Sequence, residues 1–237
     1  RSRFASEMGR PPVAGTRSHY DHTSHVRRMN EPAVLFRNPM VITLPEFHPG
    51  ERETVCALLD AGAFPVHIRK PDAPEDRIAE LLEGFSDHER KSLTLHYGTG
   101  TALKYGLGGV HIRATQLPQV PTTMRRSVSC HAMPEAERLA GNTDYVFLSP
   151  VFNSVSKPGY RAAFDLRETE KWLKSARRPA TVALGGITED NIGTVKTLGF
   201  EGAALLGSIW CLKNGRIDAA ETVRNYLKIA KKWQRNP

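Results

Sequence analysis

The sequence PATVALGGIT at residues 179–188, followed by FEGAALLGSIW at residues 200–210, decides the fold class of this chain. Each stretch is a short apolar run that ends in glycine, and one helix-length segment, 189–198, separates them. Apolar strands that alternate with helices are typical of parallel βαβ units, whose strand ends meet at one edge. Because glycine lets backbone N–H groups approach an anion closely, these two strand ends predict a phosphate site.

The same alternation continues through most of the chain. We predict eight strands, at residues 40–44, 64–69, 92–96, 109–112, 127–130, 144–148, 181–184 and 202–206. We predict helices at residues 51–61, 74–85, 100–105, 134–140, 165–175, 189–198 and 217–233, with a proline-containing loop at 113–121. Eight such units close a barrel, and no G-x-G-x-x-G of an open dinucleotide-binding sheet follows the first strand. The sequence therefore predicts a single-domain (β/α)₈ TIM barrel over residues 36–237.

Residues 1–35 differ from the rest in composition. They are rich in Arg, Ser, Pro and His and have no apolar period. Such a segment buries too little apolar surface to offset the entropy lost on ordering, so we predict a disordered basic tail.

Composition limits the class of protein. The 237 residues are 40% hydrophobic and 24% charged, as in soluble globular proteins. No apolar run approaches the roughly 20 residues that a membrane span needs, so we predict a cytoplasmic protein without membrane partners. The three cysteines, Cys56, Cys130 and Cys211, are widely spaced and form no C-x-x-C pair, which favours reduced thiols over a disulfide framework or a zinc site.

The net charge of +8 does not by itself indicate nucleic acid. Part of it lies in the first 32 residues and part in the C-terminal segment, and no basic stripe interleaved with aromatics occurs. We therefore expect an anionic small molecule as the partner, and no nucleic acid. The sequence leaves open whether the chain forms a homo-oligomer.

Four predicted strand ends carry histidine, namely His67, His96, His111 and His131. Because strand ends of a barrel converge on one face, we expect at least one of these to be catalytic or to contact a ligand.

Two cations, Arg69 and Lys70, follow the second strand and would need an anion to offset their burial. The loop NSVSK, after the sixth strand, could close over a phosphorylated ligand. It would offer that ligand the hydroxyls of Ser154 and Ser156 and the ammonium of Lys157.

Taken in order, these strand ends resemble the thiamine-phosphate synthase and thiazole tautomerase family. The motifs that carry the resemblance are VHIRK, GGVHI, SVSCH, DYVFLSPVFNSVSK, ALGGI and GAALLG, and they run from about Met40 to Trp210. The resemblance implies a (β/α)₈ fold and a site for a phosphorylated thiazole. Its phosphate would bind the backbone at Gly185, Gly186, Leu206 and Gly207.

The resemblance also implies roles for other positions. Arg69, Lys70, Ser129 and Lys157 match residues that hold the diphosphate of the second substrate, an aminopyrimidine diphosphate. His67 replaces a glutamine that faces the pyrimidine, His96 stands where the synthases have asparagine, and Ser154 and Ser156 replace two threonines. We therefore predict that this whole set binds substrate.

The departures from the family pattern concern magnesium. Synthases of the family hold Mg²⁺ with two aspartates, where this chain has Tyr97 and Gln116, which are poor magnesium ligands. We therefore predict no metal ligand, and Mg²⁺ as a cofactor only if the chain is a synthase.

The tautomerase branch needs no metal and uses a histidine after the fifth strand, which matches His131 as the catalytic residue. Tautomerase-like chemistry is the favoured interpretation, with an active synthase and a non-catalytic regulator that binds thiazole or thiamine phosphate as alternatives.

Overall fold

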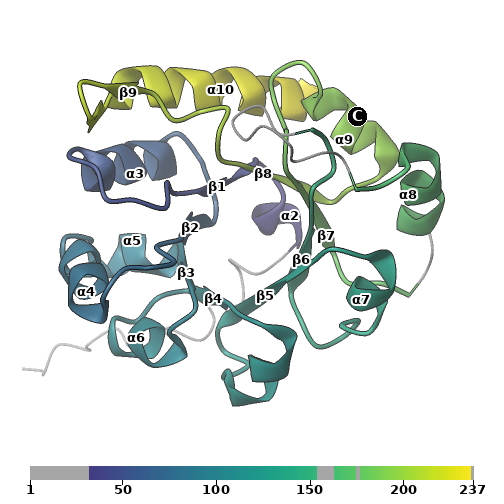
Figure 1. The fold of residues 1–237 in the computed structure, drawn as a ribbon, viewed down its shortest axis with the longest axis horizontal. Coiled ribbons are helices and arrows are strands. Elements are labelled where there is room, and N and C mark those ends of the chain that lie inside the picture. The colour runs from purple at the N-terminus through teal and green to yellow at the C-terminus, as the bar shows by residue number, and fades with distance from the viewer. Residues whose placement is uncertain (1–31, 154–162, 175–176, 236–237) are drawn as a thin grey trace, which may run out of the picture.

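The protein is a closed barrel of eight parallel strands. The structure is a computed structural model, and it describes residues 32–153, 163–174 and 177–235. The strands pair in chain order, and β1 closes the ring by pairing with β8, with Val41 opposite Leu205. This confirms the predicted (β/α)₈ barrel (Figure 1). The strands are β1 (Met40–Ile42), β2 (Val66–Ile68), β3 (Leu93–His96), β4 (Gly109–His111), β5 (Arg125–Cys130), β6 (Tyr145–Leu148), β7 (Thr181–Leu184) and β8 (Gly202–Leu205).

Helices surround this ring on the outside, as Figure 1 shows. They are α3 (Glu51–Asp60), α4 (Glu75–Glu83), α5 (Asp87–Lys91), α6 (Thr99–Lys104), the 3₁₀ helix η1 (Ala114–Gln119), α7 (Met133–Glu137), α8 (Leu166–Leu173), α9 (Ile192–Leu198) and α10 (Ala219–Arg235). Within the described residues, none of the helices combines the length and the apolar character that crossing a membrane requires.

Three short elements go beyond the predicted set. Helix α5 begins at a capping box, in which Ser86 and Glu89 each bond the other's backbone N–H. Helix η1 occupies most of the predicted loop 113–121. A two-stranded hairpin, β9 (Leu212–Lys213) and β10 (Arg216–Ile217), turns at Asn214-Gly215, where both residues have positive φ.

The two faces of the strands bury different side chains. Outward-facing residues such as Val41, Val66 and Val110 are fully buried and pack under the helices in one large apolar cluster. Inward-facing residues form a second, smaller apolar cluster, built from Leu35, Met40, Ile42, Tyr145, Phe147, Val182 and Ala204. On β2 to β5 the buried interior is instead polar, with His67, Thr94, His111, Arg125 and Ser127. The barrel interior is therefore divided into an apolar half and a polar half.

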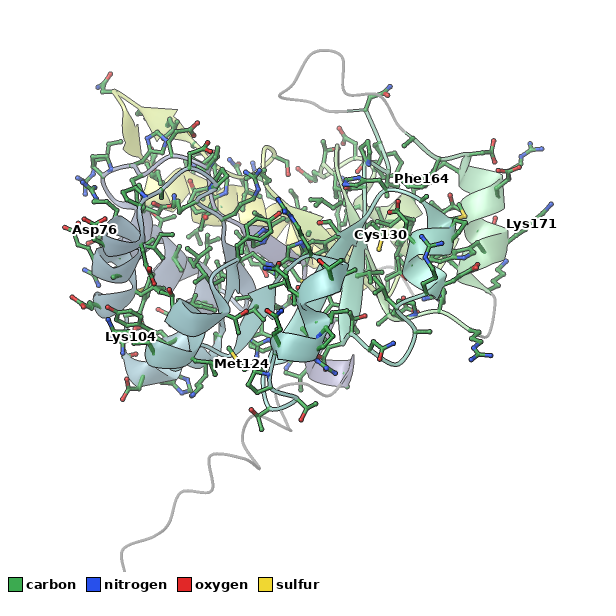
Figure 2. All side chains as sticks on the ribbon, turned by 60° about the horizontal axis from the view of Figure 1, so that its bottom comes forward. Asp76, Lys104, Met124, Cys130, Phe164 and Lys171 are labelled. Atoms are coloured by element: carbon green, nitrogen blue, oxygen red, sulfur yellow. The ribbon has the colours of Figure 1, made fainter. Side chains whose placement is uncertain are left out.

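A short helix, α2 (Pro32–Leu35), covers the end of the barrel where the strands begin. Figure 1 shows it inside the ring of strands, and Figure 2 shows it near Met124, at the opposite end of β5 from Cys130. Its Leu35 is 2% exposed and belongs to the inner cluster. The predicted tail, residues 1–35, overlaps α2, and Leu35 within this overlap is buried at the barrel end. The predicted disorder of residues 1–31 concerns a segment outside the described residues.

Replacement of Leu35 by alanine tests this closure. We expect Leu35→Ala to lower the free energy of unfolding by about 2–5 kcal/mol, since it leaves a cavity in the inner cluster. Urea denaturation measures the change. The matched control is Val34→Ala, at a position that is 41% exposed and should change stability by about 0.5 kcal/mol or less. Equal effects of the two substitutions would show that α2 does not close the barrel.

Candidate functional site

The polar half of the barrel interior ends in a group of histidines on neighbouring strands. Side chains alternate between the two faces of a strand, so His67 on β2, His96 on β3 and His111 on β4 all point into the barrel. His96 and His111 are register partners, and their rings stack with centroids 4.2 Å apart. The predicted convergence of histidines is therefore confirmed for these three side chains.

His67 is the central member of this group. Its Nδ1 lies 3.0 Å from Nε2 of His96, and its Nε2 lies 2.7 Å from the hydroxyl of Tyr145. Burial, with the nearby His111, holds the pKa of His67 well below its ordinary value, so the imidazole is neutral. The side chain has no exposed surface. A substrate in a cavity at the barrel mouth would not reach this buried side chain, so the predicted contact between His67 and the substrate does not fit.

His96 and His111 are also neutral. Burial lowers the pKa of His111 to about 3 and that of His96 well below its ordinary value, and the positive charge of Arg69 acts in the same direction on both. Nδ1 of His111 lies 2.9 Å from Oγ of Ser127, and its Nε2 lies 2.9 Å from Oγ of Ser129. These imidazoles therefore offer neutral nitrogens near pH 7, and not positive charge.

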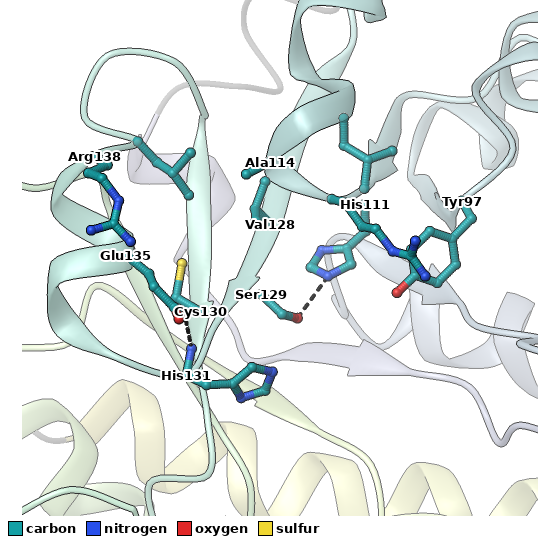
Figure 3. Close-up of a pocket in the computed structure, with 12 residues that line it drawn as sticks. Tyr97, His111, Ala114, Val128, Ser129, Cys130, His131, Glu135 and Arg138 are labelled. Carbon is teal, nitrogen blue, oxygen red and sulfur yellow. Dashed lines mark hydrogen bonds between the residues drawn. The ribbon is translucent and has the colours of Figure 1, made fainter.

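His131 has a different environment, because it lies one residue beyond the end of β5 and is exposed. Its Nδ1 lies 2.9 Å from the carbonyl oxygen of Ser149, and its backbone N–H donates to the carboxylate of Glu135 over 2.8 Å (Figure 3). A carbonyl oxygen can only accept a hydrogen bond, so Nδ1 carries the proton and Nε2 keeps a free lone pair. This is the form that a general base requires.

A cavity of about 350 Å³ joins His131 to the histidine group. It lies between the ends of β4 and β5, helix η1 and helix α7, and Figure 3 shows His111, Ser129 and His131 around it. Two exposed cations, Arg113 and Arg138, and one carboxylate, Glu135, also line it, and this excess of positive charge favours an anionic ligand. Cys130 lines it as well, but burial raises the pKa of its thiol to about 12, which excludes a thiolate nucleophile near pH 7.

The predicted site included Ser129 and His131, with His111 as one of four candidate histidines, but not Arg113 or Arg138. His111 carried a usable signal, because it ends the strand that follows His96 in the sheet. Arg138 carried none, since only the fold of α7 brings it to the cavity.

The two cations after β2 have separate environments. Arg69 is half-buried at the strand end, and its charge acts on His96 and His111. Lys70 packs under the loop that joins β1 to α3, and its Nζ donates to the carbonyls of Leu44 and Glu46 and, over 2.5 Å, to the Glu51 carboxylate. The predicted contact between Lys70 and diphosphate therefore does not fit, because all three donors are used and the side chain is fully buried.

The glycine-rich strand ends lie side by side, as the phosphate prediction requires. β7 and β8 are paired, with Leu184 opposite Ala204, and residues 185–186 and 206–207 follow directly. Gly186 has a φ of +64°, and a Cβ there would lie 2.2 Å from the carbonyl oxygen of Asn153, so only glycine fits. Phosphate binding there stays a prediction. The predicted contacts Ser154, Ser156 and Lys157 lie outside the described residues.

Comparisons with known proteins agree with this geometry. The family model described as thiamine monophosphate synthase matches residues 40–209. The thiamine-phosphate synthase of Serratia proteamaculans is 26% identical over 183 residues, which cover 73% of this chain and 86% of that protein. A second relative of the same name, from Rhodospirillum centenum, is 27% identical and is covered to 87%.

A solved structure shows the same similarity. The crystal structure of thiamine phosphate pyrophosphorylase from Bacteroides thetaiotaomicron superposes with a TM-score of 0.69 at 28% identity. The match covers 82% of this chain and 96% of the Bacteroides chain.

The ion pair between Lys70 and Glu51 gives a test of the structural role of Lys70. Burial lowers the pKa of Lys70 and raises that of Glu51, because desolvation opposes both charges. We expect Lys70→Met to lower the free energy of unfolding by about 3–5 kcal/mol, because Glu51 is left as a buried, unpaired carboxylate. The double variant Lys70→Met with Glu51→Met should regain most of that loss in urea denaturation. A fully stable Lys70→Met protein with weakened diphosphate binding would instead restore the substrate role.

Proposed function

The chain belongs to the thiamine monophosphate synthase family, and within it we propose that this protein isomerises a phosphorylated thiazole, with His131 as the general base. The observation that carries the proposal is the environment of His131. Its Nδ1–H is held by the Ser149 carbonyl, and its other nitrogen is available at a cavity lined by two arginines. A histidine with one protonated and one free ring nitrogen can accept a proton at the free nitrogen and return it.

The reaction needs only a proton shift on the thiazole carboxylate phosphate. Nε2 of His131 removes a proton from the ring, which becomes aromatic when the proton is returned at another position. The imidazolium formed in between is stabilised by the hydrogen bond from Nδ1–H to the Ser149 carbonyl. The proton returns to the substrate, so the step consumes no second reactant.

The phosphate of the substrate would bind at the ends of β7 and β8. Residues 185–186 and 206–207 place backbone N–H groups there, and Arg69 adds positive charge at the barrel mouth. Anion binding at this edge and proton transfer at His131 would then involve opposite parts of one small molecule.

Magnesium, which the synthase reaction of the family implies, does not fit the residues present. Tyr97 is 44% exposed with a φ of +62°, and it carries no carboxylate. The side-chain oxygen of Gln116 accepts the backbone N–H of Arg113 and so caps η1. Mg²⁺ prefers hard, anionic oxygen ligands, and neither position supplies one. We therefore derive no step through magnesium.

Synthase activity is the second candidate, and two observations favour it. The relatives named above are called synthases or pyrophosphorylases. In addition, Arg69 and Ser129 occupy the positions at which the resemblance implies diphosphate contacts, and Ser129 lines the cavity.

One assay separates the candidates. The protein is incubated with thiazole carboxylate phosphate and with aminopyrimidine diphosphate, separately and together, with and without Mg²⁺, and products are identified by mass spectrometry and NMR. We expect isomerisation of the thiazole alone, at a rate independent of added Mg²⁺. Thiamine phosphate formed only with both substrates and Mg²⁺ would establish the synthase instead. Binding without turnover would indicate a regulator.

Replacement of His131 tests its role directly. We expect His131→Asn to reduce kcat for isomerisation by about 10²–10⁴-fold, since a general base contributes that much to rate. Affinity for the thiazole phosphate should stay nearly unchanged, because the base adds little to ground-state binding. The control is His88→Asn, an exposed position on α5. A kcat that falls equally in both variants, or in neither, would remove His131 from the mechanism.

A further inference from the structure

We propose that His67, His96 and His111 form a binding site for a divalent transition-metal ion of the zinc class, inside the barrel and beside the cavity that His111 lines. The three side chains come from the adjacent strands β2, β3 and β4, and one ring nitrogen of each lies within 4.8 Å of the others. Among the residues that the structure describes, this is the one group of three or more His, Cys, Asp or Glu side chains close enough to share an ion. The inference does not rest on the proposed reaction.

The spacing within the group suits a shared metal. Nδ1 of His67 and Nε2 of His96 are 3.0 Å apart. Two nitrogens bound to one tetrahedral zinc, each at 2.0–2.1 Å, lie about 3.4 Å apart. Each imidazole is neutral and binds a metal through its unprotonated nitrogen, so the proton that now lies between the two rings would move to the outer nitrogen of the ring that carries it. Binding would also turn these two nitrogens toward one ion and open the stacked contact between the rings of His96 and His111.

The outer nitrogens of two of these rings already have partners. Nε2 of His67 lies 2.7 Å from the Tyr145 hydroxyl, and Nδ1 of His111 lies 2.9 Å from Oγ of Ser127. In the metal-bound form these ring N–H groups would donate to the two hydroxyl oxygens. Such contacts fix the tautomer and the orientation of a ligating histidine. His111 would then present Nε2, which faces Ser129, to the metal.

The donor set selects the class of metal. Imidazole nitrogens suit zinc and its neighbours, whereas Mg²⁺ prefers oxygen. Three protein ligands leave one coordination position open, as in catalytic zinc sites. His111 lines the cavity and His96 is half-buried, so the open position would face the cavity. The positive charge of Arg69 opposes a bound cation, and an anion such as phosphate at the open position would offset it.

Metal titration of the full chain, prepared without a polyhistidine tag, tests the site. After treatment with a chelator, Zn²⁺ is titrated in competition with a chromophoric chelator, and Co²⁺ binding is followed by visible absorption. We expect one Zn²⁺ per chain and the intense visible bands of four-coordinate Co²⁺. Neither measurement depends on catalysis, so a failure of the metal site and a failure of the proposed function can be distinguished.

Variants locate the ion. We expect His96→Ala and His111→Ala each to weaken Zn²⁺ binding by more than about 100-fold, and Tyr145→Phe to weaken it by about 10–100-fold, as for loss of an outer partner. His88→Ala, on the exposed surface of α5, should bind Zn²⁺ like the unmodified protein. His96 is the decisive position, because it is only half-buried and its replacement leaves the inner apolar cluster intact. Thermal melting followed by circular dichroism checks that each variant is folded.

Two results would overturn the proposal. One is Zn²⁺ binding of equal strength in the unmodified protein and in a folded His96→Ala, His111→Ala double variant, which would place the ion elsewhere. The other is the weak visible spectrum of six-coordinate Co²⁺ in the unmodified protein, since a three-histidine site with one open position does not produce it.

Discussion

The pairing of buried polar side chains inside the barrel, on β2 to β5, is the interaction on which the rest of the structure depends. A buried polar group without a partner costs free energy, and His67, His111 and Arg125 bond other side chains or backbone carbonyls. His67 on β2 forms hydrogen bonds with His96 on β3 and with Tyr145 on β6. Arg125 is 1% exposed, and its guanidinium donates to the carbonyls of Lys91 and Leu93 and lies over the ring of Phe64. The contacts of His67 join β2 to β3 and β6, and the contact of Arg125 with Leu93 joins β5 to β3, so the polar half links several strands of the ring.

This arrangement separates two kinds of histidine at the barrel mouth. Those inside the barrel are buried or half-buried, and desolvation keeps them neutral, so they provide nitrogen lone pairs and ring N–H donors. His131 lies beyond the strand, where water reaches it and where a carbonyl fixes its tautomer. The proposed proton transfer is therefore assigned to His131, and the proposed metal binding to the inner group. Both border one cavity, because β4 and β5 are adjacent strands.

Much of the fold could be predicted from the sequence, because strand and helix periods are local. All eight strands of the barrel lie at the predicted places, and β7 lies at the predicted residues, Thr181–Leu184. The missed elements are short. Helix α2 has four residues, too few to show a period, and it is held by the burial of Leu35 in the barrel end. Helix α5 carried a signal in its capping box, but its five residues bury no side chain fully.

The sequence by itself determined the barrel, the family resemblance and the histidines and glycines at successive strand ends, since all of these follow from local pattern and order. Only the tertiary structure decided how those residues are used. Arg69 and Lys70 are neighbours in an extended segment, so their side chains point to opposite sides. Arg69 lies at the barrel mouth, whereas Lys70 forms a buried ion pair with Glu51 of α3. Likewise, strand pairing brought His67, His96 and His111 together as one group, because the distance between strands depends on closure of the whole ring.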